Sequence, residues 1–266
     1  DAMVAKMVEL RKGKMTEEEK TAAMNNIKVT CTADSVADYA DCDLIVEAAL
    51  EVFEIKSDIF KRLDEVCKES TIIASNTSAM NIFEIVPEKL LPQQLICHWY
   101  SPPQLIPLVE VVKSDASSDE VAQTVMEVLR SVGKKPVLCK KDVPGFIANR
   151  MQHALWREAI SIVENGIADA ATVDEAVRYS FGLRLPQLGP MENADMVGTD
   201  LTYNIHDYIL RDLEDSHEPS PLLKQLRDEG KIGFKTGEGF QKWTPEQVAQ
   251  SNAELNEYLI RMLYGK

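Results

Sequence analysis

A histidine and a glutamate on neighbouring apolar runs are the residues of this sequence best suited to acid–base chemistry. His98 ends one apolar run, and Glu110 lies in the middle of the next, at residues 108–112. A lone carboxylate in a short buried strand is costly unless it meets a partner, and His98 is the nearest one. A carboxylate that binds one imidazole nitrogen leaves the other free as a general base near neutral pH. The alternative is a surface histidine beside an edge strand with a solvated glutamate, and this stretch alone leaves both open.

The segments that must position this pair alternate between strand-like and helix-like patterns. Apolar runs predict strands at residues 28–32, 43–49, 71–76, 95–98, 108–112 and 136–139. Helical spacing predicts helices at residues 34–39, 54–67, from about 81, and at 118–132. Such alternation predicts an α/β domain with a parallel sheet that helices cover on both faces. Ligands bind such sheets at the carboxyl ends of the strands, where Ala48, residues 75–78 and His98 fall.

The chain changes character after residue 143. A series of helices, with no convincing strand between them, is predicted at residues 146–166, 172–181, 191–213, 220–230 and 244–263. We therefore predict a sheet domain over residues 1–143 and an all-helical domain over residues 144–266. At the amino-terminal end, residues 1–27 are charged and helical. Thr16 and Glu19 predict a capping box that starts the second helix of a hairpin there.

Composition and charge exclude several classes of function. Acidic residues outnumber basic ones by 43 to 29 in the 266-residue chain, for a formal charge of −14. A nucleic-acid partner is therefore not expected, because phosphate binding needs a basic face. No apolar stretch approaches the length of a membrane span. The five scattered cysteines are interpreted as small buried side chains in a reducing cytoplasm, and the four histidines lack metal-ligand spacing, so no metal site is expected.

Five short motifs follow one another in a definite order along the chain. They are Ser75-Asn76-Thr77-Ser78, His98-x-x-x-Pro102, Leu108-Val109-Glu110-Val111, Pro144-Gly145-Phe146-Ile147-x-Asn149-Arg150 and Gly233-x-Lys235-Thr236-Gly237-Glu238-Gly239-Phe240. Each is weakly specific alone, but the ordered set resembles the 3-hydroxyacyl-CoA dehydrogenase family over nearly the whole chain. That family includes 3-hydroxybutyryl-CoA dehydrogenase, L-gulonate 3-dehydrogenase and carnitine dehydrogenase. The resemblance implies a Rossmann-like NAD domain, a helical dimerising domain and an active site in the cleft between them.

The resemblance also implies roles for individual residues. His98 matches the catalytic base and Glu110 the carboxylate that orients it, while Ser78 and Asn149 match groups that hydrogen-bond the reacting oxygen. The positions that match cofactor contacts are Ala48, Glu51, Lys56, Ser78, Ser101 and Lys235. From residue type alone, Ser78 and Asn149 could instead cap helices, and Glu51 and Lys56 could lie on a solvated helix face.

The sequence departs from the family's pattern in two places. The Gly-x-Gly-x-x-Gly turn of the first strand is absent, because the sequence starts after its position. We expect the sequence to be a fragment, and expect the chain as given to bind the cofactor more weakly than one with that turn. The choice between NAD and NADP stays open, since the acidic residue that discriminates them in the family lies in the same absent part of the pattern as the glycine turn. In addition, the family's frequent His-Phe-Phe-Asn-Pro reads His98-Trp99-Tyr100-Ser101-Pro102 here, so Ser101 stands where the family has asparagine.

The function expected from these observations is NAD-dependent interconversion of a secondary alcohol and a ketone by a cytoplasmic homodimer. A 3-hydroxyacyl-CoA is the expected substrate. Ser101 and the polar residues Glu192, Asn193 and Asp195 leave a small hydroxy acid as the alternative. A second alternative is a non-catalytic, crystallin-like structural or binding protein, which the missing turn would favour and the intact pair of His98 and Glu110 argues against.

Overall fold

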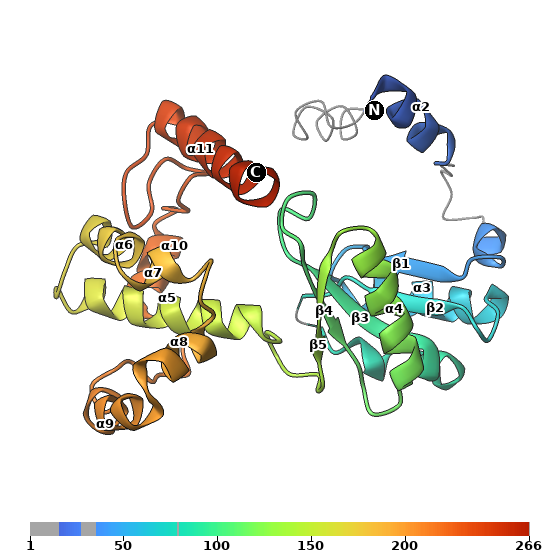
Figure 1. The fold of residues 1–266 in the computed structure, drawn as a ribbon, viewed down its shortest axis with the longest axis horizontal. Helices are drawn as coiled ribbons and strands as arrows, with labels where there is room; N and C mark the ends of the chain where they lie inside the picture. The colour runs from blue at the N-terminus through green and yellow to red at the C-terminus, as the bar shows by residue number, and fades with distance from the viewer. Residues whose placement is uncertain (1–15, 28–35, 79, 266) are drawn as a thin grey trace. The chain divides into compact units, whose positions relative to one another are not determined.

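The computed structural model describes residues 16–27, 36–78 and 80–265, which fall into two compact units (Figure 1). One unit runs as far as Arg150 and also includes the chain from Leu255, and the other spans Met151–Glu254. The predicted helix before Thr16, the predicted strand at residues 28–32 and Cys31 lie outside the described residues. The predicted boundary between residues 143 and 144 stays a prediction.

In the described part of the chain, a five-stranded sheet forms the centre of the first unit. Its strands lie side by side in chain order: β1 (Leu44–Glu47), β2 (Ile72–Ser75), β3 (Gln94–Trp99), β4 (Leu108–Val112) and β5 (Lys135–Cys139). Neighbouring strands are parallel except for β3 and β4, which are antiparallel. The expected mostly parallel, Rossmann-like α/β fold with a helical carboxyl-terminal part is therefore confirmed.

The antiparallel pair is the one departure from the expected parallel sheet. A parallel connection needs a crossover of a dozen or more residues, usually with a helix. The segment between Trp99 and Leu108 is shorter than that and contains no helix, so the chain turns back and pairs β4 antiparallel to β3. This reversal places β4 directly beside the strand that carries His98.

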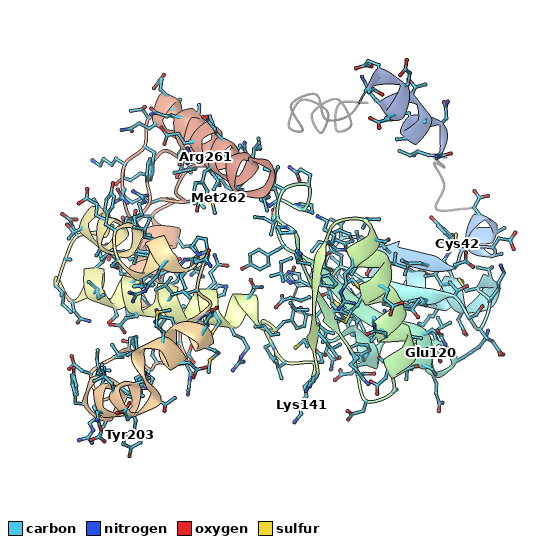
Figure 2. All side chains as sticks on the ribbon, viewed as in Figure 1. Cys42, Glu120, Lys141, Tyr203, Arg261 and Met262 are labelled. Carbon is cyan, nitrogen blue, oxygen red and sulfur yellow. The ribbon has the colours of Figure 1, made fainter. Side chains whose placement is uncertain are left out.

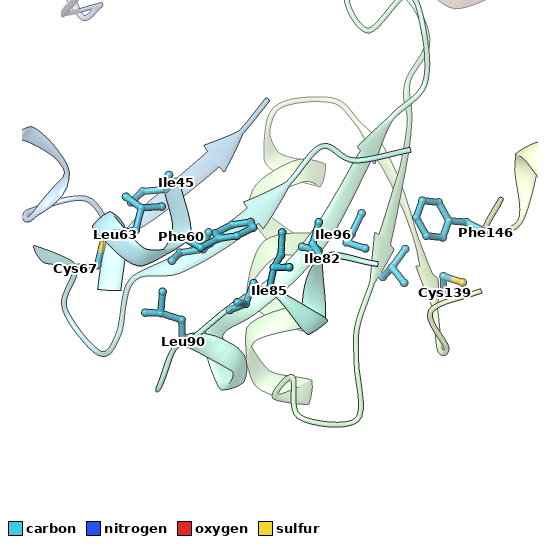
Figure 3. Packing of buried hydrophobic residues seen from close by; sticks show 13 residues of the cluster. Ile45, Phe60, Leu63, Cys67, Ile82, Ile85, Leu90, Ile96, Cys139 and Phe146 are labelled. Atoms are coloured by element: carbon cyan, nitrogen blue, oxygen red, sulfur yellow. The ribbon is translucent and has the colours of Figure 1, made fainter. Parts of the chain in front are cut away.

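Helices cover both faces of the sheet, as the apolar runs of the strands require. On one face α4 (Asp119–Ser131) packs on Leu95, Cys97 and Val109, and its other side carries exposed residues such as Glu120 (Figure 2). Ser118 caps this helix. On the opposite face α3 (Phe53–Val66) packs with the 3-10 turns η2 (Ile82–Glu84) and η3 (Glu88–Gln93) (Figure 3). Ile96 belongs to this second cluster, so alternate residues of β3 face opposite sides.

Within the described residues, two short elements precede the sheet. The helix α2 (Glu17–Asn25) begins at a capping box in which the Glu19 N–H donates to the Thr16 hydroxyl and the Thr16 N–H donates to the Glu19 carboxylate. The predicted capping box is therefore confirmed. The 3-10 turn η1 (Val36–Tyr39) falls within the helix predicted at residues 34–39.

After β5 the chain forms helices joined by loops. These helices are α5 (Ala148–Glu164), α6 (Ala170–Arg178), α7 (Phe181–Arg184), α8 (Pro190–Val197), α9 (Thr199–Ile209), α10 (Pro221–Asp228) and α11 (Pro245–Tyr264). The single helix predicted at residues 191–213 is wrong, because Gly198 has a φ of 103° and divides it into α8 and α9. No helix within the described ranges combines the length and apolar character needed to cross a membrane.

Candidate active site

The register between β3 and β4 places His98 directly opposite Glu110. Residues opposite each other in an antiparallel pair point to the same face of the sheet. The His98 Nδ1 atom lies 2.8 Å from Glu110 Oε2, Glu110 has no exposed surface, and His98 is 6% exposed. The alternative of a surface histidine beside a solvated glutamate is therefore wrong.

The other oxygen of the same carboxylate holds the start of α5. The backbone N–H groups of Ile147 and Ala148 donate to Glu110 Oε1 over 2.9 and 2.8 Å. The first N–H groups of a helix have no partner within the helix, and its amino-terminal end favours a negative charge. Glu110 thus fixes both the His98 ring and the helix whose first turn carries Asn149.

These contacts keep the Glu110 carboxylate ionised near neutral pH. Burial raises the pKa of Glu110, but the hydrogen bond to His98 and the two backbone N–H bonds at Ala148 and Ile147 outweigh it, and the net pKa is lowered. An ionised carboxylate only accepts hydrogen bonds, so His98 Nδ1 carries the proton between them. The Nε2 atom is then the ring nitrogen that can take or give a proton.

Two aromatic rings pack against the His98 imidazole. Tyr100 meets the His98 ring edge-on at 5.8 Å between centroids, and Phe146 packs against it at 5.5 Å. Phe146 is buried although its φ is 48°, in the left-handed region that few residues other than glycine adopt. It follows Gly145, whose φ is 79°. The turn before α5 therefore accepts an uncommon backbone conformation that sets the Phe146 ring against His98.

A second contact near His98 joins Tyr100 to Asn149. The Tyr100 hydroxyl donates to Asn149 Oδ1 over 3.1 Å. Burial, with the Glu110 charge as a smaller contribution, raises the pKa of Tyr100 above its usual value, so the phenol keeps its proton. Asn149 lies inside α5 rather than before it, and Glu110 occupies the capping position, so the expected alternative of a helix cap is wrong for Asn149.

Buried charges lie at the carboxyl end of β1. Both Glu47 oxygens lie 2.8 Å from Lys56 Nζ, and Lys56 has no exposed surface. The Ser75 hydroxyl and the Ala49 N–H also donate to Glu47. The alternative that Lys56 lies on a solvated helix face is therefore wrong. Lys56 Nζ also lies 3.4 Å from Glu51 Oε2, which ties the turn after β1 to α3.

The side chain of Glu51 is 43% exposed at this edge of the sheet. Its pKa is raised by burial but lowered more strongly by the Thr77 hydroxyl, which donates to it, and by Lys56, so the net pKa is lowered. Ala48, Ser78 and Ser101 are exposed at the ends of β1, β2 and β3. These ends lie along one edge because the three strands are parallel. Lys235, also exposed, belongs to the Met151–Glu254 unit.

Family models match both parts of the chain. Residues 2–143 match the model described as 3-hydroxyacyl-CoA dehydrogenase, NAD binding domain, and residues 145–243 match the model of the C-terminal domain. The chain belongs to the 3-hydroxyacyl-CoA dehydrogenase family. The family inferred from the five motifs is thereby confirmed, and this dehydrogenase is an NAD-dependent oxidoreductase of the 3-hydroxyacyl-CoA type.

Individual relatives of this dehydrogenase carry names from the family. A probable 3-hydroxybutyryl-CoA dehydrogenase of Deinococcus radiodurans is 38% identical over 87% of this chain and 81% of the relative. The human mitochondrial hydroxyacyl-coenzyme A dehydrogenase is 37% identical over 81% of this chain and 68% of the relative. A 5-formyl-3-hydroxy-2-methylpyridine 4-carboxylate 5-dehydrogenase of Mesorhizobium japonicum is 32% identical over 92% of this chain and 80% of the relative. The crystallin-like alternative is not favoured, because these relatives are named as enzymes.

Solved structures give the same assignment. A structure described as the 5-formyl-3-hydroxy-2-methylpyridine 4-carboxylic acid 5-dehydrogenase, an NAD+-dependent dismutase, superposes with a TM-score of 0.81 at 32% identity, covering 88% of this chain and 77% of that one. The (S)-3-hydroxybutyryl-CoA dehydrogenase of Ralstonia eutropha gives a TM-score of 0.72 at 27% identity, covering 91% and 83%. The dehydrogenase therefore shares its fold with enzymes named for an acyl-CoA and for a small ring acid.

Sequence reasoning missed three residues that contribute to this edge of the sheet. Glu47 pairs with Lys56, Phe146 packs on His98, and Tyr100 holds Asn149. The only signal for Tyr100 was a departure from the family pattern, because tyrosine stands where His-Phe-Phe-Asn-Pro has its second phenylalanine. The roles assigned to His98, Glu110, Ser78 and Asn149, and to the residues matched to cofactor contacts, stay predictions.

Proposed function

We propose that this dehydrogenase oxidises the alcohol of a 3-hydroxyacyl-CoA to the ketone, with His98 as the general base. The observation that carries the proposal is the buried pair in which Glu110 holds Nδ1 of His98 at 2.8 Å. With that nitrogen occupied, Nε2 removes the hydroxyl proton of the substrate. The names of the Deinococcus radiodurans and human relatives support the choice of acyl-CoA.

The residues around His98 stabilise the charges that develop. The proton taken by Nε2 makes the ring an imidazolium, and the ionised Glu110 carboxylate stabilises its charge. Ser78 and Asn149 donate hydrogen bonds to the substrate oxygen as it loses its proton. In the reverse direction His98 returns the proton to that oxygen. Burial of the pair strengthens these interactions, because the local dielectric is lower than that of water.

The side chains at the carboxyl edge of the sheet suit a nicotinamide dinucleotide. Glu51 is ionised, partly exposed and held in place by Thr77 and Lys56, so it can accept hydrogen bonds from ribose hydroxyls. Ala48, Ser78 and Ser101 are exposed along the same edge, and Lys235 is the contact proposed from the helical unit. NAD, when bound, supplies the oxidant that takes up the hydrogen and electron pair from the carbinol carbon.

Turnover with two kinds of substrate tests this proposal. Purified enzyme should form NADH from a 3-hydroxybutyryl-CoA, and a His98→Asn variant should lose that activity. A His206→Asn variant, altered at an exposed histidine of α9, is the matched control and should keep it. Turnover of a small hydroxy acid in place of the acyl-CoA would contradict the proposed substrate, and an active His98→Asn enzyme would contradict the proposed base.

The proposed assembly is a cytoplasmic homodimer formed through the helical unit. None of α5, α6, α8, α9 and α10 contains a buried residue, although they carry many large apolar side chains. Trp156, Met191, Met196 and Tyr203 are among those that are exposed. Large apolar side chains left exposed in such number favour an interface with a partner, and identical partners are the commonest case. The free, mostly buried cysteines in the described part of the chain accord with a reducing compartment.

A further inference from the structure

The Tyr100 hydroxyl contacts a group that the proposed reaction needs. It donates to Asn149 Oδ1 over 3.1 Å, while its ring meets the edge of His98 at 5.8 Å. Tyr100 directly follows β3, and Asn149 lies in the first turn of α5, so this bond joins two segments that are distant in the sequence. The Glu110 carboxylate joins the same two elements independently.

The two ends of an asparagine amide have opposite hydrogen-bonding character. The carbonyl oxygen only accepts and the NH2 group only donates. In the proposed oxidation the substrate oxygen loses its proton, so a group that stabilises it must donate. Asn149 can do so only with its NH2 group turned to the substrate, and a rotation of the side chain by half a turn would present the wrong end.

We infer that Tyr100 is a positioning residue that holds the Asn149 carbonyl and thereby presents its NH2 group to the reacting oxygen. This inference rests on the proposed function, because it takes Asn149 as the donor to that oxygen. A phenol that keeps its proton is a dependable donor to a carbonyl, and the raised pKa of Tyr100 keeps it protonated well above neutral pH. Phenylalanine, the residue of the family's pattern here, would leave the amide orientation to other contacts.

A Tyr100→Phe variant removes the hydroxyl and keeps the ring against His98. We expect kcat for the 3-hydroxyacyl-CoA to fall about three- to tenfold, the effect of one neutral hydrogen bond. The KM for NAD+ should stay within about twofold of the wild-type value, whereas a general loosening of the fold would change it. Tyr179→Phe, at a tyrosine that is 80% exposed, is the matched control and should keep full kcat.

A double-mutant cycle shows whether Tyr100 acts through Asn149. In an Asn149→Ala background the Tyr100→Phe change should have almost no further effect on kcat, because the group that Tyr100 orients is gone. An equal loss of kcat in both backgrounds would overturn the inference. So would a Tyr100→Phe enzyme with unchanged kcat.

A spectroscopic measurement tests the contact without any turnover. In protein labelled with ¹³C-asparagine, the side-chain carbonyl signal of Asn149 is assigned by its absence in Asn149→Ala. Tyr100→Phe should move that signal to lower chemical shift, as expected when a carbonyl loses a donor, and Tyr179→Phe should leave it in place. An unmoved signal overturns the positioning role of Tyr100. A moved signal in an enzyme that does not oxidise the acyl-CoA supports the positioning role and contradicts the proposed substrate instead.

Discussion

At the scale of single residues, the Glu110 carboxylate divides its two oxygens between two tasks. One oxygen accepts from His98 and the other accepts from the backbone of Ile147 and Ala148. A buried carboxylate is stable only when it is paired and fully hydrogen-bonded. The same bonds that satisfy Glu110 therefore align the proposed base with the helix that carries Asn149.

The lowered pKa of Glu110 predicts how stability depends on acidity. Its pKa in the folded protein lies below the ordinary value of 4.5, so its contribution to stability is present above that value and is lost as the pH falls through the folded pKa. In denaturant titrations from neutral pH into acid, the free energy of unfolding should fall more steeply for the wild type than for Glu110→Gln. Glu127→Gln, at an exposed position of α4, should follow the wild type. Parallel curves for all three proteins would contradict this assignment.

At this scale the sequence predicted a pair of buried partners only where both polar residues stood in apolar runs. His98 and Glu110 were recognised because each was polar within an apolar run. The burial of Lys56 was missed because lysine on a helix usually points to water, and its partner Glu47 comes from a separate strand. The contact of Tyr100 with Asn149 was missed because it depends on how β3 and α5 pack, which no local pattern contains.

At the scale of elements, the pairing of β3 with β4 decides whether the site exists. Side chains alternate between the two faces of a sheet, so a slip of one residue in this register would turn Glu110 away from His98. The sequence predicted β4 with its observed bounds. Four apolar residues and Glu110 stand there between Pro107 and Lys113. It did not predict the division of α8 from α9, since Gly198 inside a helical pattern is compatible with either outcome.

The ion pair between Glu47 and Lys56 joins β1 to α3, and its loss should destabilise the fold. Lys56→Met would leave the Glu47 charge buried without a cation and should lower the free energy of unfolding by about 3–5 kcal/mol. Adding Glu47→Gln removes that charge and should restore a large part of the loss. The measurement is urea denaturation of both variants. Lys224→Met, which breaks an exposed pair on α10, should change stability little, and a similarly small effect of Lys56→Met would contradict the importance of the buried pair.

At the scale of the whole molecule, the contrast between the two units predicts a dimer. The sheet unit has a buried core, whereas the helices α5 to α10 leave Trp156, Leu201 and Tyr203 exposed. Light scattering at micromolar concentration should therefore give twice the mass of one chain, because burying this apolar surface favours association. Tyr203→Asp should shift the mass toward the monomer. Val132→Asp, a matched change after α4 in the first unit, should leave the dimer intact. A wild-type monomer would contradict the proposed assembly.

The rate effects of His98 and Glu110, measured alone and together, test the central claim most directly. The measurement is kcat for His98→Ala, Glu110→Gln and the double variant, at saturating NAD+ and 3-hydroxyacyl-CoA. Glu110→Gln keeps the shape of the side chain but removes the charge that stabilises the imidazolium. Each single change should lower kcat by roughly 10²–10⁴, as expected for general acid–base catalysis. The double variant should be little slower than the slower single variant, because residues that act as a unit are not additive. Additive losses, or an active His98→Ala enzyme, would show that this pair is not the catalytic centre.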